Sequence, residues 1–248
     1  MDRELTFLGG GGEMGARMRA HDWSLSPLGD PSNWPQSLRT TVGLMLNSRY
    51  PMFIAWGPKL AFLYNDGYRP IFGAKHPHTL GFPFAEVWSE IWDDIRPLVD
   101  RALAGESTFN ENLHLVMERN GYPEDTWYTF SYSPVRDESG GVGGMFCACQ
   151  ETTGQVLADR RRDFRLELED RLRNLRDPLA VTAVAAETLG RYLDVGRCGY
   201  AEFDQSAEFM VVERDWTNGA MPTFAGRHRL ADFGAVGDDL RGGRTGSP

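Results

Sequence analysis

The chain has 248 residues, with 26 lysines and arginines against 35 aspartates and glutamates, so its formal net charge is −9. An acidic surface repels phosphate backbones, which argues against nucleic acid as the main partner. No run approaches the roughly 18 consecutive apolar residues that span a membrane, so we expect no membrane partner. The three cysteines do not form the even set typical of a disulfide framework, so we expect a cytoplasmic protein.

The first 21 residues are polar and rich in glycine, and we expect them to form a flexible tail. Residues 10–15 match the pattern Gly-x-Gly-x-x-Gly, and Asp30 follows downstream, as in dinucleotide-binding loops. Such a loop follows a strand and opens a helix, whereas prolines follow here, so we interpret these glycines as part of the tail. Ser32 is the expected N-cap of a helix from about Trp34 to Asn47.

Five segments then have strand-like patterns, and turn residues separate them. They cover residues 52–56, 60–64, 108–118, 126–135 and 142–150. A helix expected from Ala85 to Ala104 separates the second segment from the third, and Gly105 ends it. This order predicts an α+β domain over residues 22–153, with a five-stranded antiparallel sheet, helices on one side and an N-terminal helical extension.

A charged helical segment over residues 154–176 predicts a linker. Its apolar residues, such as Phe164 and Leu168, recur at three- and four-residue steps, and charged residues interrupt this short coiled-coil pattern. Asp177 and Pro178 are the residue types of an N-cap and a first helical position, so another helix begins there. Helix and strand patterns continue from residue 177, which predicts part of a second α+β unit over residues 177–248.

Several of these segments resemble the PAS family, namely Met52 to Gly57, Phe62 to Asp66, Trp127 to Asp137 and Gly140 to Thr153. They are most similar to the PAS domain at the head of soluble bacterial sensor histidine kinases. Those proteins typically continue through a helix into a GAF domain and then a kinase core. Residues 177–244 resemble the first half of such a GAF domain, so the resemblance implies that the chain ends within a GAF-like region.

The resemblance implies a sensory input module of a two-component system. Binding of a ligand or partner in the PAS domain would pass through the linker helix to an output domain. The implied partners are a second copy of the chain, a kinase output domain or response regulator, and a small-molecule ligand. No enzymatic activity is expected, because the phospho-accepting histidine and ATP-binding regions of the resembled kinases are absent from this sequence. The alternative is a PAS dimerisation scaffold that binds no ligand.

Aromatic and apolar side chains gather on the predicted strands and helix, and they predict a ligand cavity. Trp88 and Trp92 lie one turn apart on the expected helix. The same pattern also fits a filled hydrophobic core, and both interpretations stay open. The candidate pocket residues are Phe53, Tyr64, Trp88, Trp92, Val116, Tyr128, Phe130, Tyr132 and Cys149.

The sequence leaves the cofactor unknown. Light-sensing flavin domains of this superfamily keep a reactive cysteine before the long helix, and no cysteine occurs among residues 1–146. Their polar flavin contacts correspond to Val116, Tyr128 and Cys149, none of which is an amide. These differences argue against cysteine-adduct photochemistry and leave non-covalent flavin binding open.

The sequence gives little support for a haem site or a zinc site. Haem needs an axial ligand, and the helix expected over residues 85–104 contains no histidine, although His76 and His78 precede it and His114 lies on a strand. Cys147 and Cys149 share one face of a strand, but a structural zinc ion needs about four convergent ligands. We therefore expect no metal site.

Overall fold

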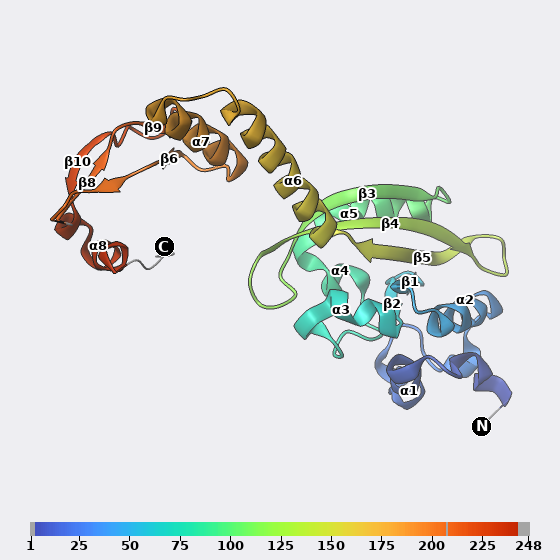
Figure 1. Cartoon of the computed structure of the whole chain (residues 1–248). Coiled ribbons are helices and arrows are strands. Elements are labelled where there is room, and N and C mark those ends of the chain that lie inside the picture. The colour runs from blue at the N-terminus through green and yellow to red at the C-terminus, as the bar shows by residue number, and fades with distance from the viewer. Residues whose placement is uncertain (1–2, 207, 243–248) are drawn as a thin grey trace. The chain divides into compact units, whose positions relative to one another are not determined.

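The computed structural model describes residues 3–206 and 208–242, and the chain divides into two compact units, Met1–Val156 and Leu157–Pro248. Figure 1 traces the elements of each unit. Within the described ranges, no helix combines the length and the apolar character needed to cross a membrane.

A five-stranded antiparallel sheet forms the centre of the first unit, in the order β2-β1-β5-β4-β3. The first strand therefore lies between the second and the last, with Phe53 opposite both Tyr64 and Cys147. This sheet confirms the predicted α+β fold. Its strands are β1 (Met52–Trp56), β2 (Ala61–Tyr64), β3 (Thr108–Met117), β4 (Glu124–Arg136) and β5 (Val142–Glu151).

Short helices make up most of the rest of the first unit. The α-helices are α1 (Gly12–Ala20), α2 (Gln36–Asn47), α3 (Arg69–Phe72), α4 (Phe84–Val87) and α5 (Trp92–Leu103). The 3-10 helices are η1 (Arg3–Leu8), η2 (Trp23–Leu25), η3 (Pro31–Asn33), η4 (Asp66–Tyr68), η5 (Gly73–Lys75) and η6 (Ser89–Ile91).

Residues 3–20, which we expected to belong to a flexible tail, are folded. Leu8, Met14 and Met18 are completely buried in the core of the first unit. Residues four apart share one face of a helix, so Met14 and Met18 point together into this core. The polar, glycine-rich composition concealed this short apolar face.

The start of α2 also differs from the expectation. Ser32 lies inside η3, where the Asp30 side chain accepts a hydrogen bond from the Ser32 backbone N–H (2.8 Å) and caps that short helix. Helix α2 begins at Gln36, and Pro35 occupies its N-cap position. A proline is well suited there because its fixed backbone angle suits a helix start and its missing N–H costs no hydrogen bond.

The helix expected over residues 85–104 is interrupted. The backbone leaves the helical region at Trp88 (φ −120°, ψ 44°) and again at Ile91 (φ −115°, ψ 9°), which separates α4, η6 and α5. The break accompanies burial of the Trp88 ring, which stacks on Phe72 with 5.1 Å between ring centroids and 6° between planes. Gly105 follows α5 with a φ of +93°, as expected for the glycine that ends a helix.

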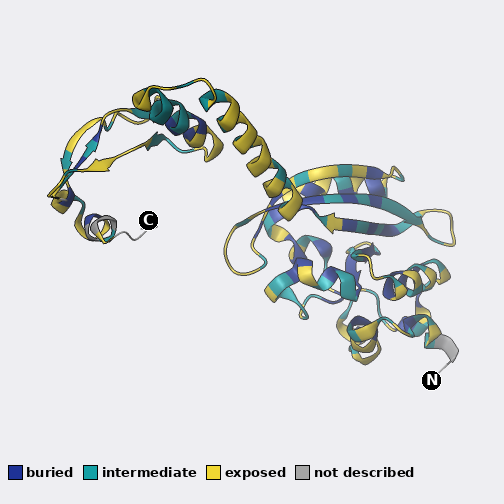
Figure 2. Cartoon of the chain, in the orientation of Figure 1, coloured by how far each residue is buried: buried dark blue, intermediate teal, exposed yellow. Residues whose placement is uncertain are grey.

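The second unit contains less buried structure than the first (Figure 2). Helix α6 (Thr153–Leu172) begins in the first unit, continues into the second and has no buried residue. The Asp177 side chain caps α7 by accepting from the Ala180 N–H (3.1 Å), as the sequence predicted. The remaining elements are α7 (Pro178–Tyr192), β6 (Arg197–Gly199), β7 (Glu202–Phe203), β8 (Phe209–Val212), β9 (Asp215–Thr217), β10 (Gly226–Arg229), η7 (Leu230–Phe233) and α8 (Gly234–Arg241).

Candidate ligand cavity in the first unit

A small cavity lies between one face of the sheet and the segment from η4 to α5. The space open to the centre of a water-sized sphere is about 30 Å³. This is enough for more than one water molecule, since one sphere needs roughly 10–15 Å³. The lining residues are Phe53, Tyr68, Ile71, Phe84, Trp88, Ile91, Ile95, Leu115, Met117, Tyr128, Phe130, Tyr132, Cys147 and Cys149.

Six of the nine candidate pocket residues line this cavity: Phe53, Trp88, Tyr128, Phe130, Tyr132 and Cys149. They come together because alternate residues of β4 and β5 face the same side of the sheet. Phe53 brings β1 into the same wall, since it pairs with Cys147 across the β1–β5 ladder.

The other three candidates lie elsewhere. Val116 is 44% exposed, because strand alternation turns it away from the face of Leu115 and Met117. Trp92 is half-buried and packs edge-on against Phe84, with 5.8 Å between the ring centroids. Tyr64 is fully buried but is not among the lining residues.

Eight lining residues were not among the candidates. They lie on the short helices η4 to α5, on β3 and at Cys147, and they are Tyr68, Ile71, Phe84, Ile91, Ile95, Leu115, Met117 and Cys147. On the strands, the alternation that marks Tyr128 also marks Leu115, Met117 and Cys147. Ile91 and Ile95 are four residues apart in the segment predicted as one helix, so helical spacing marks them. No comparable pattern marks Tyr68, Ile71 and Phe84, because η4, α3 and α4 are too short for a periodic signal.

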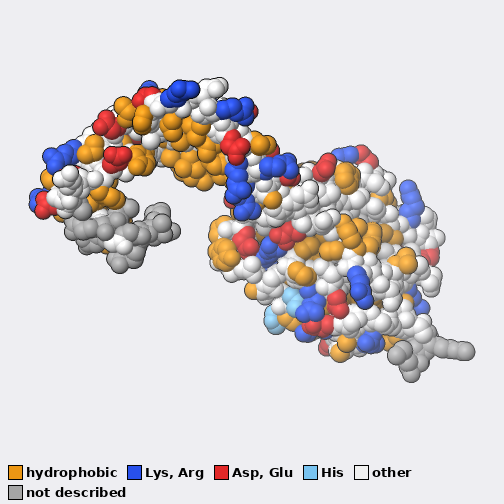
Figure 3. All heavy atoms as spheres, in the orientation of Figure 1, with side chains coloured by type: hydrophobic (Ala, Val, Ile, Leu, Met, Phe, Trp, Pro, Cys, Tyr) orange, Lys and Arg blue, Asp and Glu red, His pale blue; other side chains and the backbone are white. Residues whose placement is uncertain are grey.

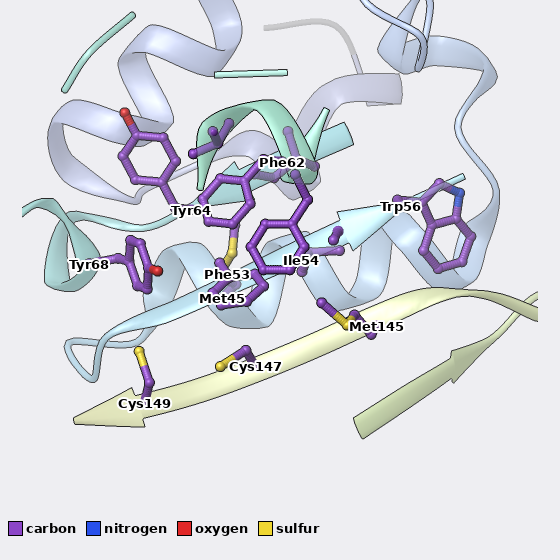
Figure 4. Close-up of a cluster of buried hydrophobic side chains, with 14 of the residues drawn as sticks. Met45, Phe53, Ile54, Trp56, Phe62, Tyr64, Tyr68, Met145, Cys147 and Cys149 are labelled. Carbon is purple, nitrogen blue, oxygen red and sulfur yellow. The ribbon is translucent and has the colours of Figure 1, made fainter. Parts of the chain in front are cut away.

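Polar atoms interrupt the apolar wall at Tyr68, Tyr132, Cys147 and Cys149. In Figure 4, Cys147 and Cys149 project from β5 on the side where Phe53 and Tyr68 lie. Burial raises the pKa of both tyrosines and of the Cys147 thiol well above their ordinary values. These groups are therefore neutral near pH 7, and neutral buried thiols are poor nucleophiles and metal ligands.

Tyr128 connects the cavity to the start of α6. Its hydroxyl accepts a hydrogen bond from Arg119 Nη1 (3.2 Å) and donates to Glu151 Oε2 (3.5 Å). Arg119 holds the Glu151 carboxylate with two further bonds of 2.7 and 2.9 Å. The Thr153 hydroxyl donates to Glu151 Oε1 (3.0 Å) and accepts from the Trp127 N–H (3.0 Å). Thr153, the first residue of α6, is thus hydrogen-bonded to the Glu151 carboxylate, which also accepts a hydrogen bond from the cavity residue Tyr128.

The charges in this network reinforce one another. Burial alone would raise the pKa of Glu151, but its hydrogen bonds from Arg119 outweigh that effect and hold it below its usual value. The same bonds raise the pKa of Arg119, and burial raises that of Tyr128. The ion pair is largely shielded, because the exposed fractions of the Arg119 and Glu151 side chains are 12% and 28%.

The glycine-rich loop before α1 packs against the protein itself. The Asp66 carboxylate accepts hydrogen bonds from the backbone N–H groups of Glu13 (3.0 Å) and Met14 (2.8 Å) at the start of α1. A Cβ atom at Gly12 would lie 2.0 Å from Asp66 Oδ2, so this contact requires glycine. An internal carboxylate thus occupies the position where dinucleotide-binding loops hold phosphate.

The three histidines considered as ligands lie outside the cavity lining. His76 joins the Tyr64 hydroxyl (2.9 Å) to Glu13 (3.2 Å), and His114 pairs with Asp125 (2.6 Å). Burial raises the pKa of Tyr64 to about 12. In the part of the chain that the structure describes, no three histidine, cysteine or acidic side chains cluster in a way that suits a metal ion.

A family model described as "PAS fold" matches residues 51–157. This part of the chain is a PAS domain. The match covers all five strands of the sheet, the cavity between them and the short helices, and the first residues of α6. Residues 158–248 lie outside it, and no curated protein matches the chain.

The chain is also similar to parts of several solved structures of sensory proteins, at low identity and low TM-score. An RNA-binding light-oxygen-voltage receptor is 17% identical, with a TM-score of 0.37 over 52% of this chain and 36% of its own. A sensory box sensor histidine kinase from Vibrio cholerae is 13% identical, with a TM-score of 0.32 over 41% of this chain and 77% of its own. The PAS domain of a Colwellia psychrerythraea protein is 13% identical, with a TM-score of 0.37 over 47% of this chain and 98% of its own. The chain thus spans about a third of the receptor's length, and these scores carry no information on ligands.

Proposed function

We propose that this chain is a sensory input module of a two-component signalling protein. Its PAS domain binds a small molecule in the cavity, or a partner, and α6 carries the response to an output domain. The observation that supports this most directly is the hydrogen-bond network from Tyr128, in the cavity wall, through Glu151 to Thr153 at the start of α6.

The relay works through competition for the Tyr128 hydroxyl. A ligand that bonds to this hydroxyl withdraws it from Glu151, and the carboxylate then rearranges relative to Thr153. A ligand shifts such an equilibrium only by the difference in its affinity for the two arrangements. The network gives that difference a physical basis, because one arrangement keeps the Tyr128–Glu151 bond and the other replaces it.

The second unit fits the opening of a GAF-like domain in this proposal. It places α7 before short antiparallel strands, in the order expected from residues 177–244. Apolar side chains gather on the face of this unit seen in Figure 3. Those left exposed on α7 include Leu179, Leu189 and Tyr192, and such patches mark surfaces that pack against another element.

The proposed setting is the cytoplasm, with a second copy of the chain as one partner. The output is a kinase domain or a response regulator, and the chain itself has no catalytic role. A ligand-free dimerisation scaffold is the competing function. It predicts the same dimer but no change in α6 when a molecule enters the cavity.

The first test is an absorption spectrum and a denaturing mass measurement of the full chain purified from cells. A chromophore band or a released small molecule supports ligand sensing. A clean spectrum without any released molecule, together with a constitutive dimer, favours the scaffold.

The relay itself is tested by hydrogen exchange in the α6 peptide with and without the released molecule. Tyr128→Phe should abolish the ligand-dependent change while the molecule still binds. Tyr50→Phe is the matched control, because Tyr50 is 45% exposed and lies outside the cavity lining. A response that survives in Tyr128→Phe contradicts the proposed relay.

A further inference from the structure

The cavity of the PAS domain contains polar atoms whose hydrogen-bonding capacity is unused. Among the described residues, no partner is found for the hydroxyl groups of Tyr68 and Tyr132. The indole N–H of Trp88, whose side chain lines the same cavity and is only 1% exposed, also lacks a partner. The Trp88 N–H is a buried polar group without a partner, which is unfavourable, so the cavity favours an occupant that bonds to it and to the two tyrosine hydroxyls that line the same space.

The lining also limits the charge of the occupant. No charged side chain is among the lining residues. Two ion pairs lie behind the lining: Arg119 with Glu151 contacts the hydroxyl of Tyr128, and Lys75, paired with Glu90, lies 4.6 Å from the centroid of the Trp88 ring. A charged molecule would lose its hydration in this cavity without gaining a counter-ion, which is strongly unfavourable.

The shape and size of the cavity favour a small aromatic molecule. Seven of the lining side chains are aromatic, and their rings surround the space. Without any change the space holds only a few non-hydrogen atoms. Met117 is unbranched and has three rotatable bonds, so it is suited to make room for one ring.

We infer that the cavity binds an uncharged molecule of one aromatic ring with a hydroxyl or carbonyl group, and that the hydroxyls of Tyr68 and Tyr132 recognise this polar group. The inference rests on the proposed sensory function and specifies the class of ligand. The ring packs against the aromatic wall, and its polar group enters the part of the cavity near Cys147 and Cys149.

Phenol and benzene are the probes that test it, because they differ by a single hydroxyl. Their dissociation constants are measured with the full chain by following its indole N–H signals in two-dimensional NMR. The same titrations are made with Tyr68→Phe and Tyr132→Phe, each of which removes one hydroxyl and leaves the ring. Tyr50→Phe is the control, since Tyr50 lies outside the lining.

The ratio of the phenol Kd to the benzene Kd is the decisive quantity, because it cancels changes in packing. We expect this ratio to rise about three- to ten-fold in at least one of the two cavity variants, the effect of losing one hydrogen bond, and to stay constant in Tyr50→Phe. Unchanged benzene binding also shows that the variants are folded.

Two results would overturn the inference, and they are distinguishable. If benzene and phenol bind but the ratio is the same in all variants, the two hydroxyls do not recognise the ligand, while the cavity and the proposed function remain. If neither probe binds the wild-type chain, the cavity admits no ligand of this class and the inference fails, whereas the proposed sensory function is decided separately by the absorption and mass measurements.

Discussion

Replacing Glu151 with glutamine should destabilise the PAS domain by about 1–3 kcal/mol. The change removes one of the two carboxylates beside Arg119, leaving Glu124 at 3.5 Å from Arg119 Nε, and keeps the size of the side chain. Exposed ion pairs contribute about 0.2–1 kcal/mol, whereas breaking a fully buried pair costs about 3–5 kcal/mol. With side chains that are 12% and 28% exposed, the Arg119–Glu151 pair lies between these limits.

The effect should also depend on pH. The pKa of Glu151 is lowered in the folded chain, so its carboxylate stabilises the fold at every pH above the unfolded value of about 4.3. This contribution is lost as the pH falls through the lower, folded-state pKa. The difference between wild type and Glu151→Gln should therefore be complete at pH 7 and should diminish as the pH falls below the unfolded value of about 4.3 and through the folded-state pKa.

Hydrogen exchange measured by mass spectrometry on the full chain checks both expectations, because peptides from β4 and β5 report the opening of the PAS domain by itself. Glu106→Gln is the matched control. Glu106 also pairs with an arginine, Arg101, but its side chain is 59% exposed, so Glu106→Gln should destabilise the domain clearly less than Glu151→Gln. The reasoning is refuted if the two variants cost the same at pH 7, or if the Glu151→Gln effect persists undiminished at pH 3.5.

Three further predictions concern the core and the N-terminal segment. Asp66→Ala removes the side chain that caps α1 and should cost about 0.5–2 kcal/mol, detected as faster hydrogen exchange in α1 than in β5. Met18→Ala should lower the free energy of unfolding, measured in urea, by about 2–5 kcal/mol, because Met18 is buried in the core. The control Leu25→Ala, at an 89% exposed position, should change it by less than about 0.5 kcal/mol. Equal effects would contradict a folded N-terminal segment. Folding raises the pKa of Tyr64 to about 12, so the neutral Tyr64 side chain stabilises the fold below the unfolded-state pKa of about 10, and this stabilisation is lost as the pH rises through 12. Between pH 9 and pH 11.5, the free energy of unfolding measured in urea should therefore fall more for wild type than for Tyr64→Phe.

Local patterns in the sequence were sufficient for the elements whose side chains alternate or whose ends have characteristic residues. The strands of the PAS sheet were predicted within a few residues. In β4 and β5 buried side chains recur at every second position, and β1 and β2 are short apolar runs bounded by turn residues. Asp177 and Pro178 located the start of α7 for a similar reason, since capping depends on residues that are adjacent in the chain.

Contacts between distant residues determined the rest. The glycines before α1 pack against Asp66, which is more than fifty residues away, so composition alone suggested a flexible tail. The same holds for the break at Trp88, where burial of the ring against Phe72 outweighs a continuous helical pattern.

The cavity residues also divide into those that a local sequence pattern identified and those that depend on contacts between distant residues. Alternation along β4 identified Tyr128, Phe130 and Tyr132 as neighbours, but Val116 was misplaced, because the apolar Leu115 and Met117 mark the opposite face of β3 as the covered one. Residue types and spacing fixed the sheet of this protein. Its cavity and the network from Tyr128 to α6 required the tertiary structure, because they join strands and short helices whose order in space no local pattern encodes.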